Sequence, residues 1–150
     1  MAFEDFAASL GLRLRVALVA AYGPEVGLDA AAEAIAYGWQ HWERVGGMSN
    51  PAGYLYRVGQ SAARREFGRR NIYMQRDPDP VLPDFDPGLV PALRRLTEHQ
   101  RVAVVMVHGY GWSQAEVADV LSVTPSTVRM HIARAMAQLK QALEVAENAD

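Results

Sequence analysis

The sequence has no cysteine, a single lysine and no long hydrophobic run. The lack of cysteine excludes disulfides, thiolate nucleophiles, iron–sulfur clusters and cysteine-based zinc sites. The longest apolar run near the N-terminus, 16–21, has six residues, whereas a membrane-spanning helix needs about 20. We therefore expect a cytoplasmic protein with no membrane segment.

Positive charge is concentrated in two segments of the chain. The net charge is −2, and 14 of the 15 basic residues are arginine. Residues 51–76 hold six arginines against one acid, and residues 92–140 hold six bases against three acids. Because the segments around them are acidic, the net charge is a poor guide to partners. Arginine forks are well suited to binding phosphate groups.

Helical periodicity runs through almost the whole chain, and no strand-like alternation competes with it. The sequence therefore predicts an all-α fold. Helices are expected from about Phe3 to Tyr22, from Ala30 to about Val45 after an Asp29 N-cap, and from Pro51 to about Arg70 after Asn50. Three more are expected: from Thr97 to about Val107 and from Ser113 to Leu121, each opened by a capping box (97–100 and 113–116), and from Thr124-Pro125 to about Ala146.

A proline-rich acidic segment divides the chain. Residues 77–91 contain five of the eight prolines and four aspartates, which predicts a linker. The expected organisation is two small helical domains, 1–76 and 92–150, joined by this linker. The sequence leaves open whether the two domains pack together or move independently.

The segment 113–139 has the spacing of a helix-turn-helix. A short helix, a turn at Ser122-Val123 and a long helix share one small predicted core, made of Val117, Leu121, Val123, Val128 and Ile132. The opposite face of the long helix carries Ser126, Thr127, Met130 and Arg134, flanked by Arg129 and His131. Such a face can enter a major groove, and Ser113 is placed to hold a backbone phosphate. The plainer alternative is a helical hairpin with a solvated polar face.

The third predicted helix combines tyrosine with arginine. Its residues Tyr54, Arg57, Ser61, Arg64 and Arg65 share one face, while Leu55, Val58 and Ala62 lie on another. Rings that stack on bases beside guanidinium groups that hold phosphates suit nucleic acid. The alternative, a solvated arginine face with Tyr54 packed in the core, is equally compatible with this helix taken alone.

Three segments together resemble the extracytoplasmic-function (ECF) sigma factors, the smallest class of bacterial initiation factors. The run 50–58, Asn-Pro-Ala-Gly-Tyr-Leu-Tyr-Arg-Val, resembles the start of their promoter-melting helix. The runs 91–97 and 118–129 resemble the entry into sigma domain four and its helix-turn-helix. The resemblance covers nearly the whole chain in order: domain two, acidic linker, domain four.

The resemblance implies a function and a set of contact residues. Such proteins bind core RNA polymerase through the second helix, which here carries Glu33, Trp39, Trp42 and Glu43. Their third helix captures a flipped base and the single-stranded minus-ten element, which implies roles for Tyr54, Tyr56, Arg57, Ser61, Arg64 and Arg65. Their last helix reads the minus-thirty-five element of promoter DNA. An anti-sigma protein is the other partner that the resemblance implies.

Several positions depart from the family pattern. Glu33 and Glu43 are the only acids inside a helix that is usually acidic, and Ser61 and Arg65 replace the usual Asn and Asp. His131 and Met136 stand where arginines are common. These departures keep two alternatives open: a sigma-derived DNA-binding regulator, or a protein-interaction module, that no longer binds polymerase productively. The tryptophans are most simply core anchors.

No motif in the chain indicates catalysis. The four histidines show no metal-ligand pairing with an acid at helical spacing, and no glycine-rich phosphate loop or catalytic triad is present. We therefore expect no enzyme activity, no metal and no cofactor.

Overall fold

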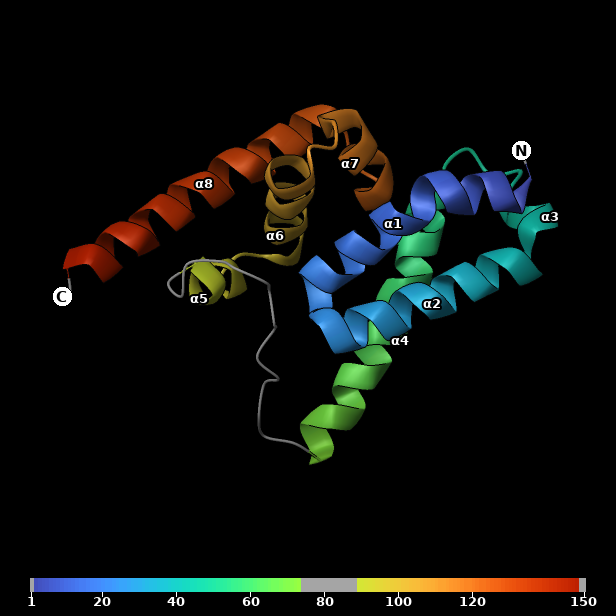
Figure 1. Ribbon diagram of the computed structural model, residues 1–150, viewed down its shortest axis with the longest axis horizontal. Coiled ribbons are helices and arrows are strands. Elements are labelled where there is room, and N and C mark those ends of the chain that lie inside the picture. Colours follow the sequence, from blue (N-terminus) through green and yellow to red (C-terminus); the bar gives the residue numbers. More distant parts are fainter. Residues whose placement is uncertain (1, 74–88, 149–150) are drawn as a thin grey trace.

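The computed structural model describes residues 2–73 and 89–148, and within these ranges every regular element is a helix (Figure 1). The predicted all-α fold is therefore confirmed. The N-terminal helices are α1 (Phe3–Tyr22), α2 (Pro24–Gln40), α3 (Trp42–Val45) and α4 (Pro51–Tyr73). The C-terminal ones are α5 (Leu89–Arg94), α6 (Glu98–Val104), the π-helical turn η1 (Val105–Gly109), α7 (Gln114–Leu121) and α8 (Pro125–Asn148).

The second helix begins and ends earlier than the sequence predicts. Gly23 adopts a positive φ of 88°, which lets the chain turn sharply after α1, and α2 begins at once with Pro24. Proline is favoured in the first helical turn because its missing N–H has no helical partner there. The prediction of Asp29 as an N-cap is therefore wrong, since Asp29 lies inside α2. A break at His41 separates the one-turn helix α3 from α2.

The fourth helix is capped as predicted and runs slightly further. The Gly53 N–H donates to Asn50 Oδ1 at 3.1 Å, which is the N-cap bond to the third helical position. The helix continues to Tyr73 rather than to about Arg70. Its exposed arginines therefore lie on an element firmly anchored at its start.

Most of the predicted linker lies outside the described residues. Residues 77–88 belong to that undescribed range, and residues 89–91 form the first turn of α5. Pro91 is tolerated there because the first turn of a helix lacks internal N–H partners. The division into 1–76, 77–91 and 92–150 otherwise stays a prediction.

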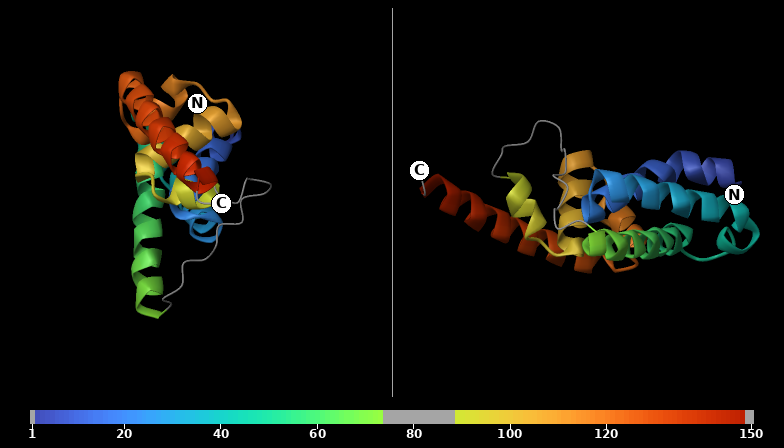
Figure 2. Two further views of the ribbon diagram at one scale, coloured as in Figure 1. Left: turned by 90° about the vertical axis from the view of Figure 1, so that its left-hand side faces the viewer. Right: turned by 90° about the horizontal axis from the view of Figure 1, so that it is seen from below.

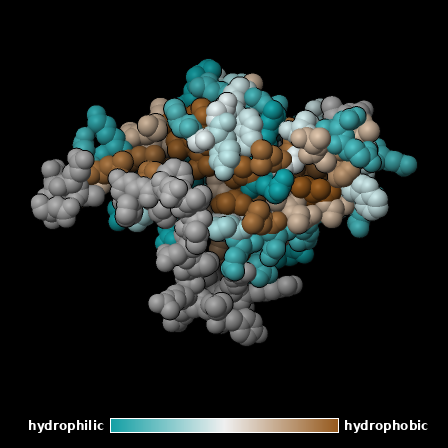
Figure 3. Space-filling view, in the orientation of Figure 1, coloured by the Kyte–Doolittle hydropathy of each residue, from teal (hydrophilic) through white to brown (hydrophobic). Residues whose placement is uncertain are grey.

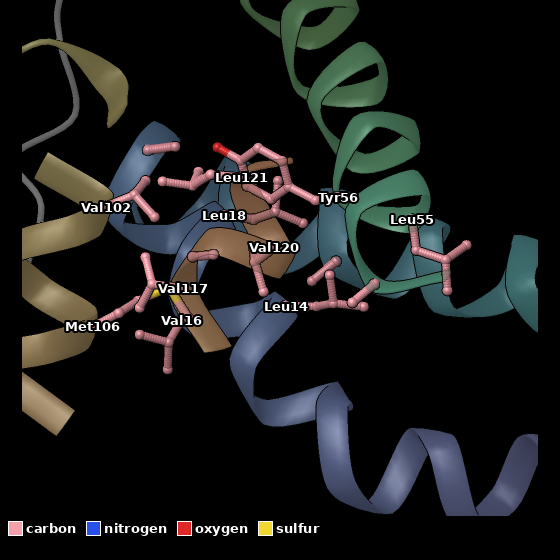
Figure 4. Packing of buried hydrophobic residues seen from close by; sticks show 14 of the residues in the cluster. Leu14, Val16, Leu18, Leu55, Tyr56, Val102, Met106, Val117, Val120 and Leu121 are labelled. Carbon is pink, nitrogen blue, oxygen red and sulfur yellow. The ribbon is translucent and has the colours of Figure 1, made fainter. Parts of the chain in front are cut away.

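The two helical units pack against each other around one apolar core. Helix α1 packs on α2, α6 and η1, and α4 packs on α2 and α7. The close-up shows side chains from α1, α4, α6 and α7 meeting there (Figure 4). Its almost completely buried members include Leu14, Leu18, Leu55, Tyr56, Val102, Met106, Val117 and Val120. The question left open by the sequence is therefore answered: the units are packed together. The C-terminal halves of α4 and α8 extend beyond the other helices (Figures 1 and 2).

One arginine of the C-terminal unit caps a helix of the N-terminal unit. The guanidinium of Arg101 donates from Nε to the Ala20 carbonyl at 2.5 Å and from a terminal nitrogen to the Ala21 carbonyl at 2.7 Å. It also donates to the Leu96 carbonyl at 3.0 Å. The last turn of α1 has no basic residue of its own, so Arg101 supplies the charge that favours a helix C-terminus.

The half-buried carboxylate of Glu98, in the C-terminal unit, gathers polar groups of the N-terminal unit. It accepts hydrogen bonds from the Tyr56 hydroxyl at 3.1 Å and from Gln60 Nε2 at 3.0 Å to each oxygen, and Arg64 lies 3.7 Å away. Burial by itself raises the pKa of Glu98. The hydroxyls of Tyr22 and Tyr56, the Gln60 amide and the Arg64 charge outweigh burial, and the pKa of Glu98 is lowered.

The start of α4 approaches the turn between α7 and α8 very closely. A Cβ atom at Gly53 would collide with the Ser122 hydroxyl and lie 2.8 Å from the Asp119 carbonyl oxygen. Asn50 Nδ2 donates to the same Asp119 carbonyl at 2.7 Å, and an Arg57 nitrogen donates to Ser122 Oγ at 3.3 Å. We call this set of five residues the turn contact.

We predict that Gly53→Ala weakens the packing of the two units although alanine favours the helix itself. The added methyl group would meet the backbone carbonyl of Asp119. A backbone atom cannot move aside as the end of a flexible side chain can. The matched control is Gly68→Ala in the same helix, where a Cβ meets nothing within 4 Å. The control should stabilise the protein by up to about 1 kcal/mol. Thermal unfolding of both variants checks this, and an equal rise in Tm for both would contradict the account.

We further predict that protonation of Glu98 at low pH weakens the packing of the two units. Because the pKa is lowered in the folded protein, the ionised carboxylate stabilises it above the ordinary pKa of 4.5, and this stability is lost as pH falls through the lower folded value. Glu98→Gln should therefore be destabilised at neutral pH, and its deficit relative to wild type should shrink below pH 4.5. Urea unfolding at several pH values measures this, with the exposed Glu144→Gln as control. A deficit independent of pH would refute the role given to the Glu98 charge.

Candidate nucleic-acid interface

Local capping defines the predicted helix-turn-helix. The Ser113 hydroxyl accepts from the Glu116 N–H and the Glu116 carboxylate accepts from the Ser113 N–H, each at 3.1 Å, which is the predicted capping box. Ser122 ends α7 in the left-handed conformation, with φ 57°. Thr124 then caps α8 by accepting from the Thr127 N–H at 3.2 Å. The turn and both helix starts are thus fixed by residues within the segment itself.

The predicted core of this motif is present. Val117, Leu121 and Val128 are buried, and Val123 and Ile132 are half-buried and pack against the same core. Because these residues turn one side of α8 inward, the opposite side of its first two turns faces outward.

Four of the predicted duplex contacts lie on that outward side. Ser126, Arg129, Met130 and Arg134 are exposed, and we call them the recognition face. Arg129 donates to Ser126 Oγ at 3.3 Å and to Gln114 Oε1 at 3.4 Å, so its guanidinium lies near the start of α7. Ser113 is exposed at that same start. The arrangement presents two guanidinium groups, a thioether and two hydroxyls to one side.

Two other predicted contacts are less accessible. The Thr127 hydroxyl shares a hydrogen bond with the Thr124 hydroxyl at 2.9 Å. His131 is half-buried and meets the His99 ring edge-on, with 5.5 Å between the ring centroids. Burial, together with the neighbouring His99 and Arg134, lowers the pKa of His131 and so disfavours its charged form. Both residues stay predicted DNA contacts. The Thr127 hydroxyl already has a partner within the chain, and the His131 ring is half-buried.

Tyr54 belongs to an aromatic cluster that the sequence analysis did not identify. Its hydroxyl lies 3.5 Å from that of Tyr37, and the Arg44 guanidinium lies 5.7 Å from the Tyr54 ring centroid and 5.9 Å from that of Tyr37. Arg44 also donates to the Tyr37 hydroxyl, and the His41 ring lies 4.3 Å from the Tyr37 ring. In the single helix that the sequence predicts over 30–45, residues 37, 41 and 44 share one face, and that spacing was the signal that could have found them. We call Tyr37, His41, Arg44 and Tyr54 the aromatic cluster.

The other predicted residues of α4 divide between the surface and the core. Arg57, Ser61, Arg64 and Arg65 are exposed. Tyr56 is 2% exposed, and its ring packs in the shared core. In this arrangement Tyr56 cannot stack on a base, and its predicted role stays a prediction that requires a different arrangement. Arg65 forms an ion pair with Glu33 of α2 at 2.8 Å. Arg65, which stands where the family usually has Asp, therefore binds one of the few acids of the predicted polymerase-binding helix.

The candidate polymerase contacts on α2 and α3 also differ in exposure. Trp39 is 65% exposed, and Glu33 and Glu43 are exposed. Trp42 instead packs between Phe3 and Phe6, with ring centroids 5.6 and 4.9 Å away, as a core anchor does. Trp39 is one of the residues that line a shallow apolar groove, which is formed by Phe3, Arg15, Leu28, Ala32, Ile35, Ala36 and Trp39. Hydrophobic surface gathers over the N-terminal helices and along α8 (Figure 3).

Neither a metal site nor a membrane helix is found in the described part of the chain. No group of three or more His, Asp or Glu side chains within 2–73 and 89–148 is placed to hold a metal ion. None of the helices described is long and apolar enough to cross a bilayer.

Comparison with known proteins agrees with this geometry. The family model described as Sigma-70, region 4 matches residues 89–139, which include α5 to the middle of α8. The ECF RNA polymerase sigma factor SigL, from three strains of Mycobacterium tuberculosis, is 28% identical over 130 residues. The match covers 77% of this chain and 73% of SigL.

A solved structure shares the fold of both units. It is that of the sigma factor RpoE in complex with the anti-sigma factor NepR, from Bartonella quintana, with a TM-score of 0.60 and 19% identity. The alignment covers 95% of this chain and 98% of that one. The region 4 match, the similarity to SigL and the shared fold agree: the chain is similar to the extracytoplasmic-function sigma factors across both helical units.

Proposed function

We propose that this protein is a transcription initiation factor that binds core RNA polymerase and directs it to promoter DNA. The observation that carries the proposal is the capped helix-turn-helix with its exposed recognition face. The protein itself binds and positions, and the polymerase supplies the chemistry. RNA polymerase acts in the bacterial cytoplasm, and that is where we place the protein.

Duplex recognition is assigned to α8. Arg129 and Arg134 present planar forks that match the acceptor pair of guanine in the major groove, and Met130 offers an apolar contact for a thymine methyl group. Ser113, Ser126 and Thr127 are placed for phosphates or base edges. His131 is assigned a supporting role in packing α8, because its ring is half-buried against His99.

Single-strand capture is assigned to α4 and the aromatic cluster. Tyr54 and Tyr37 offer ring faces on which unstacked bases can lie, and Arg44 adds a cation beside both rings. Arg57, Ser61, Arg64 and Arg65 follow along the exposed side of α4, where they can track a phosphate backbone.

Polymerase binding is assigned to the exposed side of α2, with Trp39 as its main apolar contact and Glu33 and Glu43 beside it. Trp42 holds this surface in place by packing on Phe3 and Phe6. Exposed tryptophans next to a groove are frequent energetic centres of interfaces. An anti-sigma protein is the second partner that we propose, since RpoE of Bartonella quintana binds one.

A second candidate function is a sigma-derived DNA-binding regulator without productive polymerase contact. The observation that favours it is the Glu33–Arg65 ion pair at 2.8 Å, which engages one of the few acids of α2 within the chain itself. The salt dependence of duplex affinity distinguishes both of these candidates from a protein-interaction module whose DNA binding is vestigial. Duplex affinity that hardly changes with salt would favour that module, because few phosphates would then be contacted.

We predict opposite effects of two substitutions on the two DNA forms. Arg134→Ala should weaken duplex binding by about 1–3 kcal/mol if the guanidinium contacts a base, and should leave single-strand binding unchanged. Tyr54→Ala should spare duplex binding and impair promoter opening by the holoenzyme. Fluorescence anisotropy and permanganate footprinting measure these effects, with Lys140→Ala, further along α8, as the control. Equal effects of both substitutions on both assays would refute the assigned roles.

We predict stable co-elution with bacterial core RNA polymerase in size-exclusion chromatography, competed by another sigma factor. Trp39→Ala should weaken this binding by about 2 kcal/mol or more, as expected of an interface centre. Tyr110→Ala, which removes another exposed aromatic ring away from α2, is the matched control. Duplex binding without any polymerase binding at micromolar protein would instead support the sigma-derived regulator.

A further inference from the structure

Two histidines that are far apart in the sequence meet where α6 packs on α8. His99 lies in the first turn of α6, and His131 lies in the second turn of α8. Their rings meet edge-on, with 5.5 Å between the centroids and 88° between the ring planes. Both side chains are half-buried, so each remains partly accessible to solvent. Because the two residues come from different helices, helical spacing along the sequence does not reveal the pair.

The two helices that carry this pair are held together by a small apolar core of their own. Val104 of α6 is buried there with Ala135 and Leu139 of α8. The pair therefore stands on two packed helices rather than on a loop, which keeps the distance between the two backbones fixed. Sites built on packed helices hold their ligands more precisely than sites on loops.

One nitrogen of the pair has no partner within the protein. His131 Nδ1 is buried, and it has no hydrogen-bond partner in the part of the chain that the structure describes. Buried polar atoms are nearly always paired in folded proteins, so such an atom requires an explanation. An imidazole nitrogen that is not protonated is the commonest metal ligand in proteins. A cation held between the two rings would supply the missing partner.

The separation of the two rings suits a shared metal ion. A zinc–nitrogen bond measures about 2.0–2.1 Å, which places the ion about 3.2 Å from the centroid of each ligating imidazole. Two imidazoles at a tetrahedral angle then have centroids about 5.2 Å apart, close to the observed 5.5 Å. In the edge-on arrangement one ring must turn for both nitrogens to point at the ion. The χ2 torsion of histidine has a broad energy minimum, which permits that turn.

The chemistry of the pair selects the class of ion. Imidazole suits zinc, nickel and copper, whereas magnesium and calcium prefer carboxylate and carbonyl oxygens. The chain has no cysteine, and within 2–73 and 89–148 no third His, Asp or Glu joins the pair. Water then completes the coordination of the ion. The charge of Arg134, which acts on His131, opposes a cation and keeps the affinity modest.

We infer that His99 and His131 form a two-histidine site for a divalent transition-metal ion such as zinc, with water as its other ligands. The ion joins the start of α6 to α8, the helix that carries the recognition face. An ion that binds the folded protein in preference to the unfolded chain stabilises the fold by mass action. The inference goes beyond the proposed function and does not depend on it, because it involves neither DNA nor polymerase.

The experiment uses the full chain without an affinity tag and zinc chloride as the probe. Isothermal titration calorimetry measures zinc binding to the wild type, to His99→Gln and to His131→Gln. The matched control is His108→Gln, which removes an exposed histidine on η1. Magnesium chloride is the control ion. Ring nitrogen NMR spectra of the wild type, which has four histidines, show which of them respond to zinc without reliance on any variant.

We expect one zinc ion per wild-type chain and a shift of the His99 and His131 ring signals alone. Each of the two glutamine variants should weaken zinc binding about tenfold or more, since each removes a direct ligand, whereas His108→Gln should not. Zinc at about 100 times its Kd should raise the Tm of the wild type by about 5 °C or more. Magnesium should have no effect on either measurement.

Three results would overturn the inference. The first is a wild type that binds no zinc at millimolar concentration. The second is zinc binding that is unchanged in both glutamine variants. The third is a response of the His41 or His108 ring signals in place of those of His99 and His131. None of these results bears on the proposed function, which the DNA and polymerase assays test separately.

Discussion

The close approach of α4 to the α7–α8 turn is the constraint on which the arrangement of the two helical units depends. Only a residue without a side chain at position 53 lets the backbone of α4 reach the Asp119 carbonyl. That approach brings Tyr56 into the core beside Leu121 and lets its hydroxyl reach Glu98. The apolar core of α1, α4, α6 and α7 then forms across what the sequence presents as a domain boundary.

One helix consequently serves two purposes that compete. Helix α4 uses Tyr56 to hold the units together, and it offers Tyr54 and Arg57 to a proposed DNA strand. Arg57 itself hydrogen-bonds the α7–α8 turn in the packed form, so capture of a phosphate by this arginine must replace a contact within the protein.

The sequence predicted what depends on neighbouring residues and missed what depends on distant ones. The caps at Ser113 and Asn50 follow from side chains within three positions of the N–H groups that they bind, and both were predicted. The start of α2 was missed because Asp29 is a good N-cap in isolation, while Pro24 after a positive-φ glycine is a better helix start. Periodicity could not predict that Tyr56 is covered by the C-terminal unit. The spacing of apolar residues identifies which face of a helix is buried, but it does not identify the element that covers that face.

The central claim is that the two units are packed in the free protein. It is tested most directly by the distance between spin labels on Gly68→Cys in α4 and Gln138→Cys in α8, measured by double electron–electron resonance in the otherwise cysteine-free chain. The account predicts a single narrow distance distribution for the free protein, which broadens when Gly53→Ala is added. A broad distribution in the free protein without that substitution would contradict it.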